Sequence, residues 1–380
     1  MARPLRLGAD SARSRRYRAR AREGGVWEYR SAATCGILSS RMAYVVRPAE
    51  LADLGAFESL IAQARAGITS LAIDRDTLRK RIEQSLSSFA KQTREPGDER
   101  YFFALEDSKT GNIAGMCAIR AAVGLKEAFY SYRVGTVVHA SKELAVHLKL
   151  PALYLSNDYT GCAELTSLFL GPEHRGKHLG ALLSKSRLLF MADFPERFGD
   201  KVIAEIRGVS DARGRSPFWD GLGQHFFAMD FPTADHLVGA GNKSFIAELM
   251  PKHPIYVLFL PKEAQDAIGQ PHENSRLALR LLETEGFHYE GYIDIFDAGP
   301  TVECRRDDIH AVRQSRRRMA HVGTDQRHSS RCMVSNAQLR GFRCCLADVA
   351  LPNDEMVVID AETASTLQVS EGDQIRVLES

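Results

Sequence analysis

Residues 164–183 read Glu-Leu-Thr-Ser-Leu-Phe-Leu-Gly-Pro-Glu-His-Arg-Gly-Lys-His-Leu-Gly-Ala-Leu-Leu, and the fold can be read outward from them. The first seven residues predict a strand that ends at Leu170. A basic loop with several glycines follows. A helix is predicted from about Gly180, because apolar residues recur there at helical spacing: Leu179, Leu182, Leu183, Leu189 and Phe190. The stretch therefore predicts a strand, a loop and an amphipathic helix in succession.

The loop contains the residue types of a phosphate site, namely Arg175, Gly176, Lys177, His178 and Gly180. In a strand–loop–helix of this kind, backbone N–H groups and the positive end of the helix point at one place. The glycines let a ligand approach the backbone closely, and the two cations add positive charge. Two interpretations stay open on these residues alone: a site for a phosphate or diphosphate, or an ordinary solvated basic turn.

Hairpin strands and helices alternate along the rest of the chain. Strands are predicted over residues 44–46, 101–105, 112–119, 133–139, 152–155, 202–206 and 289–296. Helices are predicted after Pro48 and over residues 216–227, 261–268 and 275–285, with Gly286 as the left-handed cap of the last one. This mixture predicts an α+β, or mixed α/β, fold with its main domain over residues 43–312.

The C-terminal part divides into two segments of different composition. Residues 313–336 are rich in Arg, Ser and His and have no apolar period, so we expect a linker there. Residues 337–380 predict a small β-rich unit, with strands over 356–359 and 374–377. A unit of this size buries too little apolar surface to be stable alone, so we expect it to dock on the main domain.

Residues 1–42 differ from everything that follows. They hold ten Arg, no Lys and three acids, which gives a net charge of +7 and leaves −5 for the rest of the chain. This segment predicts disorder, and three interpretations compete: a transit peptide, an arm that binds nucleic acid, or an upstream extension of a protein whose natural first residue is Met42. We expect the third, because organised sequence begins directly after it.

Composition excludes several classes of protein. Hydrophobic residues make up 44% of the chain and charged residues 26%, which rules out wholesale disorder and a collagen-like structure. The apolar runs are all shorter than the roughly 18 residues of a membrane-spanning helix. The seven cysteines have neither CxxC nor Cys/His spacing, which argues against a disulfide framework and a structural zinc site. We expect a cytoplasmic protein that contacts neither a membrane nor nucleic acid.

The loop resembles a known motif. Arg175-Gly-Lys-His-Leu-Gly-Ala is similar to the acyl-coenzyme A motif of the GCN5-related N-acyltransferases, Arg/Gln-x-x-Gly-x-Gly/Ala, and Ser216–Phe227 is similar to a later helix and turn of that superfamily. The sequence departs from the motif at His178, which stands where the pattern has its first glycine. The resemblance implies an acyl-coenzyme A N-acyltransferase core in which residues 175–178 and Gly180 hold the diphosphate of the carrier.

Longer stretches resemble one family of that superfamily, the arginine N-succinyltransferases. They run in the family's order over roughly residues 43–305: 132–144, 155–161, 245–256 and 292–304. The resemblance implies transfer of a succinyl group from succinyl-coenzyme A to the α-amine of L-arginine, the first step of arginine catabolism to glutamate and succinate. The amine would attack the thioester directly, so neither a nucleophilic side chain nor a metal is expected.

Site residues follow from the resemblance and from the chemistry of the two substrates. The family's proton-donating histidine falls on His272, in Gly269-Gln-Pro-His, and Leu168 is implied to contact the coenzyme. Histidine holds or releases a proton near neutral pH. A guanidinium calls for a carboxylate that can bind it through two hydrogen bonds, and Asp158 and Glu164 are the candidates, with Glu205 third. Each acid could also be an ordinary surface or ion-pair residue.

Three alternatives stay open. The chain could acylate ornithine or another amine, since the sequence does not resolve the pocket that would tell an ammonium from a guanidinium. It could be a regulatory protein that binds acyl-coenzyme A without catalysis, which the departure at His178 supports. The arginine-rich residues 1–42 could bind nucleic acid. A homo-oligomer or a paralogous second subunit is compatible with the sequence as well.

Overall fold

The computed structural model describes residues 44–64, 74–176, 178–211, 213–239, 248–324 and 329–379. The segment 1–42 and Lys177, which the sequence analysis singled out, lie outside these ranges. All the described residues belong to one compact unit, Met42–Ser380.

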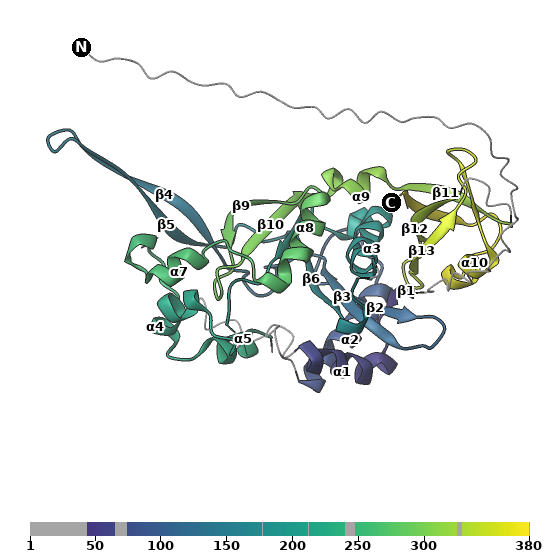
Figure 1. The fold of residues 1–380 in the computed structure, drawn as a ribbon, viewed down its shortest axis with the longest axis horizontal. Helices are drawn as coiled ribbons and strands as arrows, with labels where there is room; N and C mark the ends of the chain where they lie inside the picture. Colours follow the sequence, from purple (N-terminus) through teal and green to yellow (C-terminus); the bar gives the residue numbers. More distant parts are fainter. Residues whose placement is uncertain are drawn as a thin grey trace, which may run out of the picture. The chain divides into compact units, whose positions relative to one another are not determined.

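The centre of the fold is an antiparallel sheet with helices on both faces (Figure 1). Its strands are β1 (Tyr44–Pro48), β2 (Arg100–Asp107), β3 (Ile113–Arg120) and β6 (Ala163–Leu170), which pair in this order. Helices α1 (Leu54–Ala64) and α2 (Arg75–Ala90) cover one face, and α3 (Leu179–Asp193) covers the other. Strands and helices are mixed in this core, as the α+β, or mixed α/β, prediction expects.

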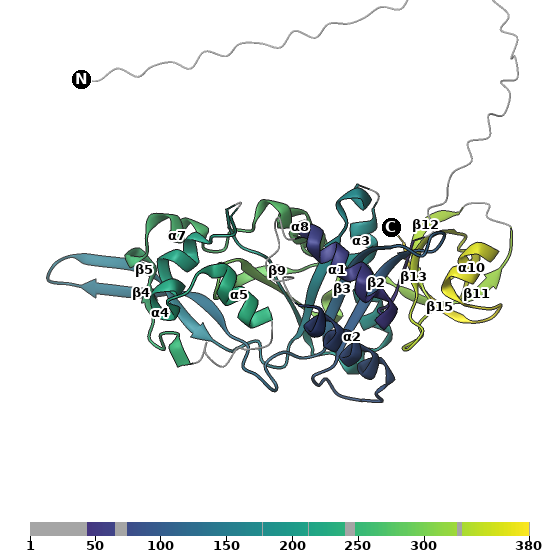
Figure 2. The same ribbon diagram turned by 90° about the horizontal axis from the view of Figure 1, so that it is seen from below.

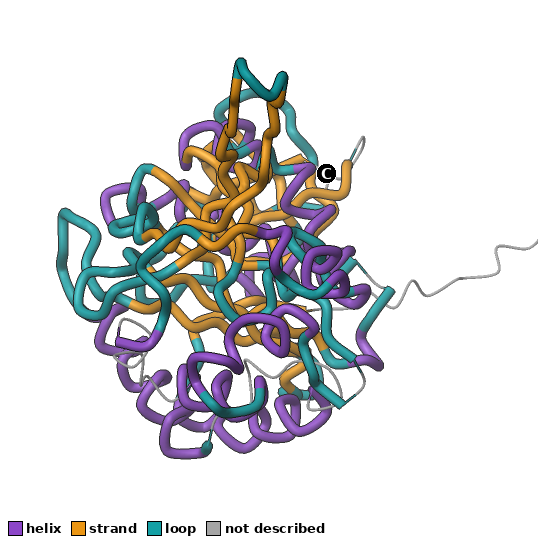
Figure 3. The backbone as a smooth tube through the Cα atoms, turned by 90° about the vertical axis from the view of Figure 1, so that its left-hand side faces the viewer, coloured by secondary structure: helices purple, strands orange, loops and turns teal. Residues whose placement is uncertain are grey.

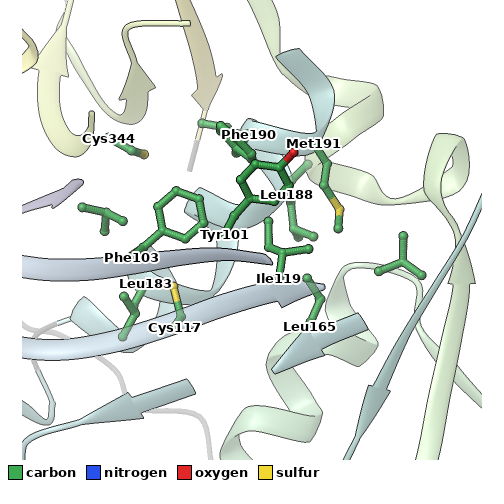
Figure 4. Packing of buried hydrophobic residues seen from close by; sticks show 14 of the residues in the cluster. Tyr101, Phe103, Cys117, Ile119, Leu165, Leu183, Leu188, Phe190, Met191 and Cys344 are labelled. Atoms are coloured by element: carbon green, nitrogen blue, oxygen red, sulfur yellow. The ribbon is translucent and has the colours of Figure 1, made fainter. Parts of the chain in front are cut away.

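Alternation along the strands sends apolar side chains to both faces of the sheet. On the α3 face, Tyr101, Phe103 and Ile119 are buried against Phe190 (Figure 4). On the other face, Phe102, Ala104 and Ala118 are buried with residues of α1 and α2. A strand that is buried on both faces appears in the sequence as a continuous run of apolar residues. Residues 101–105 therefore predicted a strand although they lack polar–apolar alternation.

The sheet continues beyond β6 through the middle of the chain. It adds β7 (Lys201–Glu205), β10 (Pro300–Arg305), β9 (His288–Ile293), β4 (Ser131–Ser141), β5 (Val146–Ser156) and β8 (Ile255–Tyr256), in that order. The hairpin of β4 and β5 extends away from the other elements in Figures 1 and 2. Near its base lie α4 (Gln224–Phe227), α5 (Phe231–Gly239) and α7 (Lys262–Ala267), around the buried Trp219.

The C-terminal unit starts earlier than expected. The linker predicted over residues 313–336 is wrong, because β11 (Arg316–Val322) and β12 (Ser330–Ser335) lie there. They share a core with β13 (Cys344–Val349), β14 (Met356–Ile359), α10 (Ala361–Leu367) and β15 (Gln374–Glu379). The buried positions of β11 include Arg318, an arginine that donates to the carbonyl of Asn353, so the strand carries no apolar period.

The expectation that this unit docks on the main domain is confirmed. Strand β13 pairs with β1 through Val45 and Cys345, which joins the two parts into one sheet. Within the described residues that sheet has fifteen strands, from β14 at one edge to β8 at the other. Figure 3 shows the strands in the middle, with the helices and loops packed around them.

The mixed α/β class is confirmed, and most predicted elements lie within a few residues of their expected places. Gly286 takes the left-handed conformation, with φ 97°, after α8 (Arg276–Thr284). Helix α2 and helix α9 (His310–Gln314) were not predicted. Among the described residues, no helix is both long and apolar enough to cross a bilayer, and no three His, Cys, Asp or Glu side chains cluster as metal ligands would.

Candidate functional site

The site begins where two neighbouring strands part. Strands β6 and β7 run parallel but pair only at their first residues, Ala163 with Val202 and Glu164 with Ile203. Beyond these pairs β7 continues along β10, while β6 stays with β3. One edge of β6 is thereby left open from Leu165 onward, and a wedge-shaped gap opens through the sheet.

A β-bulge on β6 lies beside this gap. Phe169 pairs with Met116 and Thr166 with Ala118, so Ser167 and Leu168 together face Cys117 alone. Ser167 takes the left-handed conformation, with φ 55°. A bulge of this kind leaves backbone groups unpaired and turns the strand, which is common next to active sites. The predicted coenzyme contact, Leu168, is therefore one of the two residues of the bulge.

The gap holds a cavity of about 240 Å³. Its walls come from the bulge of β6, from residues 204–207 at the end of β7, from Arg187 of α3, and from Ser275, Ala278 and Leu282. Four carboxylates and two guanidinium groups line it: Glu164, Glu205, Asp294, Asp297, Arg187 and Arg207. The walls thus carry more negative than positive charge, which suits a cationic substrate.

The loop after β6 brings the positive end of α3 close to the bulge. His178 is the residue before α3, and its backbone is left-handed with φ 59° and ψ 4°, a conformation that glycine adopts without strain. This explains why the superfamily's motif has glycine here, and it shows that histidine keeps the turn. A Cβ atom on Gly176 or Gly180 would meet nothing within 4 Å, so the loop is open above both residues.

The first turn of α3 supplies donors to this open space. The N–H groups of Leu179, Gly180 and Ala181 have no acceptor within the helix, as in the first turn of any α-helix. Arg175, in the turn before it, is exposed. Donors and helix dipole together suit an anion, although Lys177 lies outside the described residues.

Arg187 is a wall residue that the sequence analysis missed. It sits in the third turn of α3, is 2% exposed, and donates to the carbonyl of Thr166 at 3.4 Å and to the carbonyl and hydroxyl of Ser184. Burial lowers the pKa of its guanidinium. The sequence does carry a signal for Arg187, because it is an arginine within an otherwise apolar helix face.

His272 lies at the rim of the cavity, between two of its lining residues. Its backbone N–H donates to the carbonyl of Arg207 at 2.8 Å, and its carbonyl accepts from the N–H of Ser275 at 2.9 Å. Its Nδ1 accepts from the N–H of Asn274 at 3.1 Å, so the neutral ring carries its proton on Nε2. Burial, aided by the charge of Arg207, lowers the pKa of His272.

The segment that carries His272 is held by Asp297. The carboxylate of Asp297 accepts from the N–H of Gly208 at 2.7 Å and from that of Gly299 at 2.8 Å. Gly208 forms a β-bridge with Pro271, the residue before His272. A buried carboxylate thus fixes the end of β7 and the histidine loop relative to each other.

The two predicted acids differ in position. Glu164 lines the cavity, and its carboxylate accepts from Arg120 at 3.0 Å. Asp158 does not line it: it lies in the turn before β6, where it accepts from the hydroxyl of Tyr292 at 2.8 Å. That hydrogen bond lowers the pKa of Asp158. Of the predicted site residues, Glu164 and Leu168 line the cavity, and His272 is hydrogen-bonded through its backbone to two lining residues, Arg207 and Ser275. The loop at residues 175–180 and Asp158 are not among the lining residues.

Comparisons with known proteins identify the family of the chain. The model of the arginine N-succinyltransferase beta subunit matches residues 44–311, and the model of that subunit's C-terminal domain matches residues 316–379. The second match begins where β11 begins, in line with the corrected boundary of the C-terminal unit.

Curated relatives and a solved structure match over most of the chain. An arginine N-succinyltransferase of Escherichia coli is 49% identical over 335 residues, which cover 88% of this chain and 97% of that protein, and one of Shigella flexneri matches equally well. The structure of the arginine/ornithine succinyltransferase subunit AI of Pseudomonas aeruginosa is 39% identical, with a TM-score of 0.82, and covers 89% of this chain and 99% of that one. The chain belongs to the arginine N-succinyltransferase family.

Proposed function

We propose that this chain transfers a succinyl group from succinyl-coenzyme A to the α-amine of L-arginine. The observation that carries the proposal is the gap between β6 and β7: a bulged, open strand edge leads from the N-terminus of α3 to a cavity with an acidic wall. Family membership supports the reaction, and the geometry supports where it takes place.

The coenzyme is proposed to bind along β6. Its diphosphate would meet residues 175–180, where the exposed Arg175, the open backbone at Gly176 and Gly180, the turn at His178 and the first N–H groups of α3 converge. Lys177 is proposed to add a second cation. The unpaired backbone at Leu168 would hydrogen-bond the amide-bearing arm of the carrier, much as a neighbouring strand would.

The reaction itself requires few catalytic groups from the protein. The α-ammonium first loses a proton to solvent; the α-amine of a peptide has a pKa of about 8 and that of a free amino acid is somewhat higher, so a useful fraction is free at mildly alkaline pH. The free amine then attacks the thioester carbon. The nitrogen gives its second proton to solvent, and the carbon–sulfur bond breaks as the thiolate departs. Backbone N–H groups at the bulge are proposed to stabilise the oxyanion that forms in between.

His272 is proposed to stabilise the thiolate sulfur as it leaves. Since Nδ1 accepts from Asn274, Nε2–H is the donor of the neutral ring, and we propose that it faces the neighbouring cavity. The lowered pKa keeps the ring neutral at the pH where the amine is free, so Nε2–H acts as a hydrogen-bond donor to the thiolate until solvent protonates it. The imidazole ring thus orients the leaving thiolate and supplies a polarised hydrogen-bond donor to it.

We propose that a carboxylate of the cavity wall binds the guanidinium of the acceptor, L-arginine. Glu205 is the strongest candidate, because it lines the cavity at the end of β7, next to Arg207 and the loop of His272. The predictions for Glu164 and Asp158 stay untested. Glu164 already shares its carboxylate with Arg120, and an acceptor would have to reach beyond the cavity wall to meet Asp158.

Mass spectrometry tests this proposal directly. The purified chain is incubated with succinyl-coenzyme A and equal amounts of L-arginine and L-ornithine, and we expect N-succinylarginine to be the main product. Succinylornithine as the main product would favour the ornithine alternative, and no amino-acid product at all would favour a binding protein. We also propose the cytoplasm as its place of action, because the six cysteines that the structure describes are all unpaired thiols.

A further inference from the structure

Arg187 is a cation within an otherwise apolar stretch of α3. It is 2% exposed, and the residues that follow it along the chain, Leu188, Phe190 and Met191 among them, belong to the buried core (Figure 4). Transfer of a guanidinium from water into such surroundings is costly, and only hydrogen bonds and a nearby anion offset the cost. The partners of Arg187 therefore show whether the fold alone accounts for its charge.

The hydrogen-bond partners of Arg187 are neutral groups. Its Nε donates to the carbonyl of Ser184 at 3.2 Å, and its two Nη atoms donate to the hydroxyl of Ser184 at 3.2 Å and to the carbonyl of Thr166 at 3.4 Å. A guanidinium has five N–H groups, so these three bonds leave donors for a ligand. Among the described residues, no Asp or Glu forms an ion pair with Arg187, whereas the buried Arg376 pairs with Asp193.

The position of Arg187 gives these donors a place to bind a ligand, because its side chain lines the cavity between β6 and β7. It contacts Thr166, the residue directly before the bulge of Ser167 and Leu168. The other guanidinium of the described wall, that of Arg207, belongs to the residue that binds the backbone of the histidine loop. Arg187 is thus the cation of the wall that lies next to the bulge.

The course of α3 brings Arg187 to the acyl end of the proposed coenzyme path. Strand β6 ends at Leu170, and α3 begins at Leu179. Arg187 follows about two turns later, roughly 12 Å along the helix axis, and contacts Thr166 in the middle of β6, so α3 runs back along the strand. A coenzyme whose diphosphate lies at the start of α3 and whose arm follows β6 therefore carries its acyl group toward Arg187.

We propose that Arg187 binds the distal carboxylate of the succinyl group and thereby selects succinyl-coenzyme A among acyl donors. This inference rests on the proposed function and adds the residue that recognises the donor. A planar guanidinium binds a carboxylate through paired hydrogen bonds, and the substrate supplies the anion with which Arg187 pairs. The carboxylates of the wall, Glu205 among them, are then left to the cationic acceptor.

The wild-type enzyme gives the first test through a matched pair of acyl donors. Butyryl-coenzyme A has the same four-carbon acyl chain but carries a methyl group in place of the carboxylate. We expect kcat/KM for butyryl-coenzyme A to be lower than that for succinyl-coenzyme A by about tenfold or more. A difference smaller than about twofold would overturn the inference.

Variants assign the preference to a residue. Arg187→Gln should reduce the preference for succinyl-coenzyme A over butyryl-coenzyme A about tenfold, and Arg187→Lys should keep part of it. The preference for L-arginine over L-argininamide, which lacks the α-carboxylate charge, should stay unchanged in both variants. A loss of that second preference instead of the first would mean that Arg187 binds the acceptor, and would overturn the assignment.

Arg197→Gln is the matched control for a structural role. Arg197 is also buried, at 3% exposed, and also donates to neutral groups, the hydroxyl of Tyr101 and the carbonyl of Ser88, but it does not line the cavity between β6 and β7. Its loss should lower the temperature of unfolding and leave the donor preference unchanged. If Arg187 were only structural, its variants would behave in the same way, and the inference would be wrong.

The two proposals fail in different ways. Absence of N-succinylarginine with the wild-type enzyme contradicts the proposed function. Normal formation of N-succinylarginine, with a donor preference that survives in folded Arg187→Gln and Arg187→Lys, contradicts the role of Arg187 alone. If neither variant folds, a crystal structure of the wild type with a non-hydrolysable analogue of succinyl-coenzyme A decides: a carboxylate on the guanidinium of Arg187 supports the inference, and one bound by Arg207 or by solvent overturns it.

Discussion

Two groups of arginines in this protein each lie around one buried carboxylate, and they differ in how completely hydrogen bonds satisfy their guanidinium groups. In the first, which we call the docking seam, Asp193 at the end of α3 accepts from Arg317 and Arg376, each at 2.8 Å. Arg376 donates its remaining N–H groups to the carbonyl of Ala192 and the hydroxyl of Ser315. In the second group, the arginine cluster of Arg81, Arg100 and Arg120, Glu164 accepts from Arg120, and the buried Nε of Arg100 has no acceptor among the described residues.

The two groups differ in what they adjoin. At the docking seam, carboxylate and carbonyl oxygens accept from the arginines, and the seam fastens β11 and β15 of the C-terminal unit to α3. Arg100 and Arg120 of the cluster instead line a separate cavity of about 210 Å³. Variants at the seam should therefore change stability, while variants around the cavity between β6 and β7 should change turnover.

The largest effect is expected at the docking seam. Asp193→Ala leaves two arginines without their shared carboxylate, and loss of one partner from a buried ion pair costs about 3–5 kcal/mol. Urea unfolding followed by circular dichroism measures this loss. Asp200→Ala is the control, since its carboxylate is 87% exposed and 3.6 Å from Arg306, and it should cost under about 0.5 kcal/mol. Equal losses in the free energy of unfolding for the two variants would contradict a stabilising role of the docking seam.

The second-largest effect is expected for His272→Ala, which should lower kcat about 10²-fold with little change in stability. His272→Gln retains an N–H donor and should be less impaired. In the wild type, burial holds the pKa of His272 below its ordinary 6.5, so the ring gains its proton only as the pH falls below that value. Protonation of the substrate amine lowers kcat with falling pH in both proteins, and we expect the wild type to show a further inflection below pH 6.5 that His272→Gln lacks. A kcat for His272→Ala within a factor of a few of the wild type would remove the histidine from the mechanism.

Glu205→Gln should have a smaller effect that is confined to the acceptor. If this carboxylate binds the guanidinium, the KM for arginine should rise about tenfold while the KM for succinyl-coenzyme A stays unchanged. Initial-rate kinetics with one substrate varied at a time measure both constants. Glu283→Gln, an exposed position of α8, is the control for the lost charge. A rise in the KM for succinyl-coenzyme A alone would contradict the assignment.

The smallest effect is expected for the stability of Arg100→Gln. This change removes one of three neighbouring like charges, so the free energy of unfolding should change by less than about 1 kcal/mol, or increase. The urea unfolding used for Asp193→Ala compares the two arginine groups under one condition. A loss of 3 kcal/mol or more would mean that Arg100 is held as tightly as the seam, and the contrast between the groups would disappear.

The sequence alone was enough to predict the strand, loop and helix around residues 164–183, because apolar spacing and glycines mark them. It did not predict α2, although Asp74 caps its N-terminus and Leu78, Ile82 and Phe89 recur at helical spacing. Most other residues of that helix are charged or polar, which hid the signal. Strand β11 was taken for part of a linker, because one of its buried positions is an arginine whose donors find partners only in the folded chain.

The cavity could be predicted only in part for a similar reason. Leu168, Glu164 and His272 came from the resemblance and the chemistry of the substrates, but the gap between them depends on where β6 and β7 separate. The bulge at Ser167 has neither glycine nor proline to announce it. Arg187 comes from α3, and only the packing of α3 against β6 shows that it lines the cavity.

The crystal structure of the protein soaked with a non-hydrolysable analogue of succinyl-coenzyme A tests the central claim most directly. The account predicts that the diphosphate lies at residues 175–180, that the arm runs along the open edge at Leu168, and that the succinyl group ends in the cavity between β6 and β7. An analogue bound at another surface, with this gap left empty, would contradict it.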